Sequence, residues 1–184
     1  MNVLIKKRYI RVERKETKNM ENEKQDRINE ILRHKQFLRY LKENEKAEEN
    51  RVFCKHQIEH FLDVARIAYI KILEEGKRDK KELVYAMALL HDIGKHRQYF
   101  YGTPHEVASA ELSEEILVDC GYEKAEREQI KTAILNHRTK PTKQSDIFSK
   151  ILYEADKQSR NCFFCKAKTE CHWSEEKKNK QILL

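Results

Sequence analysis

Glycine and proline are scarce in this sequence of 184 residues. Four glycines and two prolines make up about 3% of the chain, where an average composition would give about 12%. β-Sandwiches and barrels need many tight turns, which these residues usually form. Their scarcity therefore argues against such folds and predicts a mostly helical protein. The length fits one domain.

Long apolar runs are also missing. No segment approaches the roughly 18–20 apolar residues of a membrane span. The apolar start Val3-Leu4-Ile5 runs directly into three basic residues, so it does not resemble a secretory signal. The five cysteines are an odd number, and without a signal peptide we expect reduced thiols or metal ligands rather than disulfides. We expect a cytoplasmic protein without a membrane partner.

The net charge of +7 is confined to the two ends of the chain. Residues 1–18 carry seven basic and two acidic groups, and residues 166–184 carry five and three. The 147 residues between them hold 26 of each sign. A basic arm remains open, but this distribution does not predict a nucleic-acid-binding body.

Apolar residues recurring near the 3.6-residue period predict six helices, over residues 21–50, 56–75, 79–90, 103–120, 124–137 and 146–157. The third is apolar on every side from Leu83 to Leu90, which predicts a buried central helix. The pattern Asp79-Lys80-Lys81-Glu82 predicts a capping box at its start. In the next helix, Thr103 is expected to cap, with Pro104 in the first helical position and Glu106 closing a second box.

These elements predict one all-α domain with irregular ends. We expect a basic tail over residues 1–19, a helical domain over 20–160 and a cysteine-rich tail over 161–184. A short strand over residues 3–12 and a true start at Met20 are alternative interpretations of the first segment.

Histidine and aspartate residues lie at the boundaries of apolar stretches in the predicted helices. The pair His91-Asp92 ends the most buried helix, where an unpartnered carboxylate is costly. Each residue alone is more often a satisfied core residue than a ligand. However, five helices each deliver such a group, and this mixture of imidazole and carboxylate suits Fe, Mn, Zn or Co better than Mg or Ca. The set is His60, His91, Asp92, His105, His137 and Asp156.

This pattern resembles the HD superfamily of metal-dependent phosphohydrolases. The resemblance rests on His60-x-x-x-Val64-Ala65, on the stretch from Leu89 to Lys95 that contains His-Asp-Ile-Gly-Lys, and on Asp156, and it covers about residues 51–160. His105 and His137 look like the two extra histidines of binuclear members. The segment from Ser149 to Lys157 is more loosely similar to bacterial HD-domain hydrolases of dinucleoside tetraphosphates.

The resemblance implies a helical bundle around a metal centre. A first divalent metal would be held by His60, His91, Asp92 and Asp156. Asp92 would bridge to a second metal held by His105 and His137. Lys95 and Arg138 would contact phosphate oxygens. The alternative is that both are simply solvated, as basic residues that follow a helix end usually are. The upstream His56 is a weaker alternative to His60, which has the Val64-Ala65 context.

The cysteines form a second constellation, Cys162-x2-Cys165-x5-Cys171. Three thiols leave a tetrahedral zinc site one ligand short, and Cys54 is the expected fourth. Cys54 lies six residues before His60 and Cys162 six after Asp156, so shared metal binding by His60 and Asp156 would bring the thiols together. His172 and Cys120 are weaker candidates, and an iron–sulfur cluster, free thiols and a redox pair remain alternatives to structural zinc.

The leading functional hypothesis is a phosphohydrolase that acts on a nucleotide or related phosphate ester through a metal-activated water, with Asp92, Lys95 and Arg138 as reacting or phosphate-contacting residues. Two other classes remain open: a metal-holding regulatory or interaction domain without turnover, and a zinc protein that binds nucleic acid through its basic ends.

Overall fold

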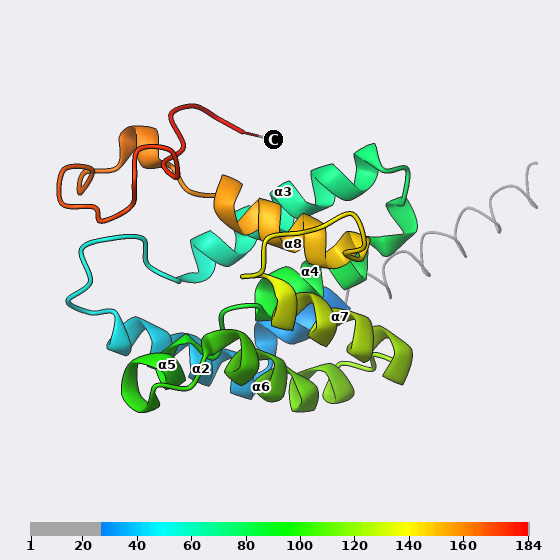
Figure 1. Ribbon diagram of the computed structural model, residues 1–184. Helices are drawn as coiled ribbons and strands as arrows, with labels where there is room; N and C mark the ends of the chain where they lie inside the picture. The colour runs from blue at the N-terminus through cyan, green and yellow to red at the C-terminus, as the bar shows by residue number, and fades with distance from the viewer. Residues whose placement is uncertain (1–26, 184) are drawn as a thin grey trace, which may run out of the picture.

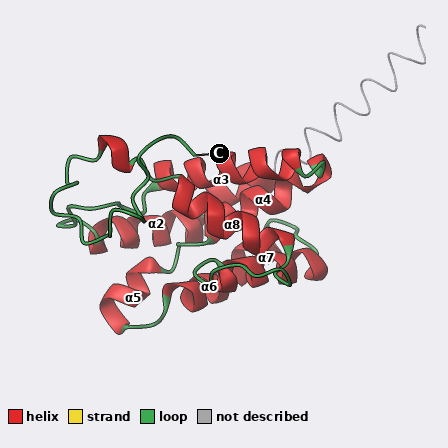
Figure 2. Ribbon diagram, turned by 45° about the horizontal axis from the view of Figure 1, so that its top comes forward, coloured by secondary structure: helices red, strands yellow, loops and turns green. Residues whose placement is uncertain are grey.

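Helices and connecting loops make up the whole described structure. It is a computed structural model that describes residues 27–183, and the expected tail over 1–19 lies outside this range. No strand occurs in the described range (Figure 2), which confirms the all-α prediction. After a first helix over residues 27–33, the α-helices are α2 (Lys35–Ala47), α3 (Ile58–Glu74), α4 (Lys81–Leu90), α5 (Lys95–Tyr101), α6 (His105–Asp119), α7 (Lys124–Asn136) and α8 (Ile147–Gln158). Two short 3-10 helices, η1 (Arg78–Lys80) and η2 (Cys162–Phe164), complete the series.

Helix α4 is the central helix, as its apolar sequence predicts. It packs against α3, α7 and α8 (Figure 1), and its residues Val84, Ala86, Ala88, Leu89 and Leu90 are fully enclosed. Around it, α6 packs on α7 and α5, while α5 also contacts α2. Since the His-Asp pair follows α4 directly, this arrangement places the pair at the centre of the bundle.

The predicted helix over 21–50 is wrong in its continuity. The described part is broken at His34, whose Nδ1 accepts a hydrogen bond from the Gln36 backbone N–H (3.2 Å) and so starts α2 as a separate helix. Leu38, expected on the buried face, is 43% exposed, while Phe37 and Tyr40 are buried instead. Residues 21–26 lie outside the described range.

Both predicted capping boxes are wrong. Asp79 lies in η1, where its carboxylate pairs with Lys80 (2.9 Å), and α4 has no side-chain cap. Pro104 has an extended ψ of 127° and stands outside α6, so the helix begins one residue later, at His105. The side-chain oxygen of Gln98, on α5, accepts a hydrogen bond from the His105 backbone N–H (3.4 Å), which performs part of the role expected of a cap.

Two other helix starts have side-chain caps. The Ser149 backbone N–H donates to Asp146 Oδ1 (2.9 Å), as suits the predicted helix start at 146. Glu123 and Glu126 form a capping box that the sequence analysis did not anticipate. Within residues 27–183, no helix is long and apolar enough to cross a membrane.

Candidate metal centre

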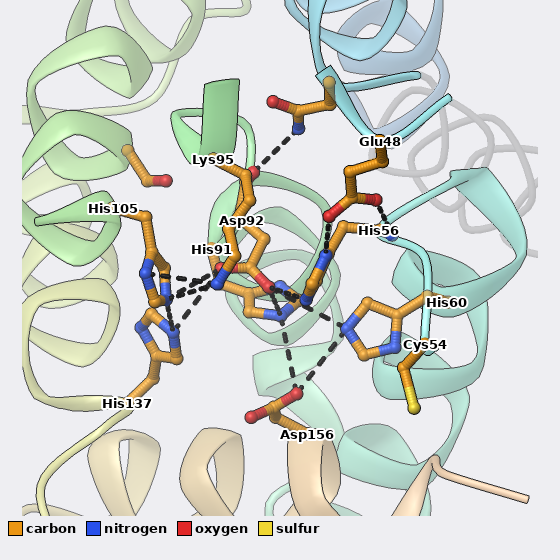
Figure 3. A network of polar contacts seen from close by, with 12 residues as sticks. Glu48, Cys54, His56, His60, His91, Asp92, Lys95, His105, His137 and Asp156 are labelled. Atoms are coloured by element: carbon orange, nitrogen blue, oxygen red, sulfur yellow. Dashed lines mark hydrogen bonds and ion pairs between the residues drawn. The ribbon is translucent and has the colours of Figure 1, made fainter. Parts of the chain in front are cut away.

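Six donor residues from five helical segments meet in one buried cluster (Figure 3). His60 lies on α3, the His-Asp pair in the turn after α4, and Asp156 near the end of α8. Two further histidines stand at helix ends, one opening α6 and one capping α7. The structure thus brings together every residue predicted for this cluster: His60, His91, Asp92, His105, His137 and Asp156.

Backbone hydrogen bonds orient two of the histidine rings. His91 donates from Nδ1 to the carbonyl of Ala88 (2.7 Å), and His137 donates from Nδ1 to the carbonyl of Ile134 (2.6 Å). A ring that carries its proton on Nδ1 presents the lone pair of Nε2. These contacts therefore direct two acceptor nitrogens into the cluster.

Asp92 lies between two sets of histidines. Its Oδ1 is 3.1 Å from His105 Nε2 and 3.6 Å from His137 Nε2. Its Oδ2 is 3.4 Å from His91 Nε2 and 4.0 Å from His60 Nε2. One carboxylate thus faces both sets, as a bridging ligand would.

Asp156 lies beside His60 and His91, the two histidines that face Oδ2 of Asp92. Its Oδ1 is 3.5 Å from His60 Nε2 and 4.0 Å from His91 Nε2. The Nε2 atoms of both histidines are buried without a hydrogen-bond partner. Because buried polar atoms are nearly always satisfied, two orphaned imidazole nitrogens beside two carboxylates fit bound cations.

Burial sets the protonation of the cluster. It lowers the pKa of His60 to about 3, aided by the neighbouring His91 ring, and it lowers the pKa of His91 to about 4 and of His105 to about 3. Burial opposes ionisation of the acids, but Arg160 and Lys157 hold the pKa of Asp156 well below its usual range. The pKa of Asp92 is likewise held down, by His91 and Lys95. Neutral imidazoles and ionised carboxylates are the forms that bind transition metals.

His56, the weaker candidate for the position of His60, also faces the cluster. Its Nε2 is 3.4 Å from Asp92 Oδ2, and its Nδ1 lies 2.5 Å from Oε1 of the buried Glu48. Tyr99 donates from its hydroxyl to the same Oε1 (2.7 Å). Despite burial, the contacts from His56 and Tyr99 lower the pKa of Glu48.

Asn44 is a buried residue that the sequence analysis missed. Its side-chain N–H donates to the carbonyl of Asp92 (2.9 Å), and its Oδ1 accepts from the backbone N–H of His96 (2.7 Å). It therefore ties both sides of the turn that carries the His-Asp pair to α2. The available signal was a polar residue on the apolar face of a helix, following Phe37, Tyr40 and Leu41.

A cavity of about 730 Å³ opens onto the cluster. Lys95, predicted to meet phosphate, lines it with Nζ 3.2 Å from His105 Nδ1. Arg138 lines it too, half exposed and bonded to Glu106 (3.3 Å). Lys157 and Arg160 were not predicted; both pair with Asp156, the latter at 3.2 Å. Basic groups thus surround the donors.

The four predicted cysteines line a second cavity, of about 390 Å³, which His60 also lines. All four thiols are free and partly buried. No three of them come within 4.8 Å of one another in residues 27–183. His172 lines this cavity as well, whereas Cys120 is not part of its lining.

Comparisons with known proteins agree with this geometry. The chain is 51% identical over 157 residues to an uncharacterized protein of Clostridium beijerinckii (strain ATCC 51743 / NCIMB 8052), a match that covers 85% of this chain and 98% of the relative. No solved structure gives a significant match. The HD domain family matches residues 58–161, which carry all six donors of the cluster. The chain therefore belongs to the HD superfamily of metal-dependent phosphohydrolases.

Proposed function

We propose that this protein is an active phosphohydrolase that cleaves a nucleotide or a related phosphate ester. The observation that carries the proposal is the position of Asp92, whose two carboxylate oxygens face two histidine sets at the floor of a cavity with a basic lining. A cavity of about 730 Å³ beside the ligands leaves room for an anionic substrate.

The donors divide into two sites that share Asp92. His60, His91 and Asp156 would hold one cation together with Asp92 Oδ2, and His105 and His137 would hold the other with Oδ1. Bound divalent cations of the Fe, Mn, Co or Zn type would lower the pKa of a water and neutralise charge on the attacked phosphoryl group.

Basic side chains around the cavity suit an anionic substrate. Lys95 and Arg138 stand on the side of His105, and Lys157 and Arg160 stand on the side of Asp156. Lys157 and Arg160 pair with Asp156 and line the same cavity, so a phosphate bound there would lie beside them. Guanidinium and ammonium groups bind phosphate oxygens through charge-assisted hydrogen bonds.

His56 is placed to hold a proton at the edge of the reaction site. Glu48 fixes its Nδ1, and its Nε2 points toward Asp92 and the cavity. A histidine fixed in this way by a buried carboxylate is suited to donate a proton to a leaving group. We assign it this role.

The test is to purify the protein, measure its metal content, and assay it against nucleotides, dinucleoside polyphosphates and simple phosphate esters. The variant Asp92→Ala is expected to lose metal and turnover together, while the exposed control Glu111→Ala keeps both. Turnover retained in Asp92→Ala would refute the mechanism. A metal-loaded wild-type protein inactive on the whole panel would instead favour the regulatory or interaction domain.

A further inference from the structure

The cysteine cavity joins two segments that are distant in the sequence. Cys54 comes from the loop before α3, while the other three cysteines come from η2 and the turns that follow it. In Figure 1 the loop before α3 (cyan) and the C-terminal segment (orange to red) lie on the same side of the bundle. The contact between His60 and Asp156 explains why the two segments converge. Cys54 lies six residues before His60, and Cys162 lies six residues after Asp156.

The lining of this cavity is strongly basic. Asp63 is its one carboxylate among the described residues, against the five basic side chains Arg51, Lys55, Arg160, Lys168 and Lys178. A group bound by several thiolates carries net negative charge, which such a lining compensates. The electrostatic surroundings therefore suit a metal–thiolate group.

Arg160 adds a more specific signal. It lines the cavity together with the four thiols and stacks on Trp173, with the guanidinium carbon 4.5 Å from the ring centre. Its Nε is buried without a hydrogen-bond partner. A buried, unpartnered N–H on a residue that lines the thiol cavity can donate to a group bound there, and hydrogen bonds to the sulfurs are a regular feature of iron–sulfur sites.

The room among the thiols favours a cluster over a single ion. A tetrahedral zinc ion with bonds of about 2.3 Å would draw its four sulfurs to about 3.8 Å from one another. Here no three described sulfurs come within 4.8 Å, and a cavity of about 390 Å³ lies among them. A cubane cluster holds its cysteine ligands on its outer corners, farther apart than one ion does.

We propose that Cys54, Cys162, Cys165 and Cys171 bind a [4Fe–4S] cluster. The cluster fastens the C-terminal segment to the loop before α3. In the described structure that segment is tied to the end of α8 by Asn179, which donates from its side chain to the carbonyls of Lys157 and Arg160 (both 2.8 Å).

The experiment measures iron, zinc and acid-labile sulfide in the full chain, purified without oxygen and then reconstituted with ferrous iron and sulfide. Sulfide separates cluster iron from iron at the histidine–aspartate centre, which contains none. We expect about four sulfides per chain, with visible absorption that bleaches on reduction. Cys54→Ser and Cys165→Ser should lose the sulfide, while Cys120→Ala, a cysteine outside the cavity, should retain it.

Two results would overturn the proposal. One is about one zinc per chain, without sulfide, that is lost in Cys54→Ser, because this identifies a zinc site. The other is a sulfide content that the cysteine variants do not change. Circular dichroism of each variant checks that the helices are intact. The sulfide content of Asp92→Ala should equal that of the wild type, so failure of the hydrolase proposal and failure of this one are distinguishable.

Discussion

Replacing Gly94 by alanine should damage both stability and metal binding. Gly94 closes the turn that carries the His-Asp pair, and its backbone N–H donates to Ser109 Oγ on α6 (2.9 Å). A Cβ at this position would lie 2.6 Å from the backbone nitrogen of Ser109 and 2.7 Å from two atoms of Ala108. The φ angle of −88° suits any residue, so the obstacle is space rather than backbone conformation.

The overlap sets the size of the effect. The closest contact is about 0.8 Å shorter than the 3.4 Å at which ordinary contact begins, and backbone atoms cannot rotate away. Overpacking of this kind costs about 1–3 kcal/mol, and rigid neighbours place Gly94→Ala near the upper end. For a chain of this length, a loss of about 3 kcal/mol lowers the melting temperature by about 6–12 °C. The added methyl group should push α6 away from the turn, and α6 begins with the metal-ligand candidate His105. Metal binding should therefore weaken about tenfold or more.

The assay pairs thermal unfolding with metal titration, and Gly102→Ala is the control. Gly102 has a φ of +72° with nothing within 4 Å of its added Cβ, so the control should lose about 1–2 kcal/mol through backbone strain alone. Its metal affinity should be unchanged. If Gly94→Ala lost no more stability than Gly102→Ala and bound metal as the wild type does, the steric argument would be refuted.

Three further outcomes are expected. First, the free energy of unfolding of the metal-free protein should fall as the pH falls from about 6.5 to about 4. Histidines in the unfolded chain take up protons near pH 6.5, whereas burial keeps His60, His91 and His105 neutral to a lower pH in the folded protein. Each of these rings therefore lowers the free energy of unfolding by up to about 1.4 kcal/mol per pH unit. Urea unfolding between pH 7 and pH 4.5 measures this, and a flat profile would contradict the buried neutral rings. Second, Asn44→Ala should cost about 2–4 kcal/mol, because it leaves a buried carbonyl and a buried N–H unpaired; chemical denaturation is the measurement, and a loss below about 1 kcal/mol would speak against this bracing role. Third, Mn²⁺ or Zn²⁺ at one hundred times its Kd should stabilise the wild type by about 2.7 kcal/mol; a thermal shift of equal size in Asp92→Ala would place the metal elsewhere.

The residues that sequence reasoning found share a local signature. His91, Asp92, His105 and His137 stand at helix ends, and Asp156 stands next to the last apolar positions of α8. A polar residue at such a boundary interrupts the 3.6-residue recurrence of apolar residues in the helix. This interruption is visible in the sequence without knowledge of the fold. The central position of α4 was also predictable, because a helix without a polar face must be covered on all sides.

The supporting residues have no such signature. Asn44 is 48 residues from the carbonyl that it holds, and Glu48 lies in a charged segment that resembles an exposed helix face. Their roles follow from the packing of α2 against α5, which only the tertiary structure shows. Helix starts were missed for a related reason, since Gln98 reaches the start of α6 from another helix.

The cysteine cavity joins positions that sequence spacing relates to the metal centre. The equal separations of six residues predict that Cys54 and Cys162 converge once His60 and Asp156 meet, and in the structure both cysteines line one cavity. The spacing of the cysteines in the sequence does not give the distances between their sulfur atoms. Those distances differ between a single bound ion and a cluster. They depend on the loops. Arg160 pairs with Asp156 and lines both cavities. A group bound by the cysteines must therefore meet the same guanidinium that neutralises a ligand of the metal centre.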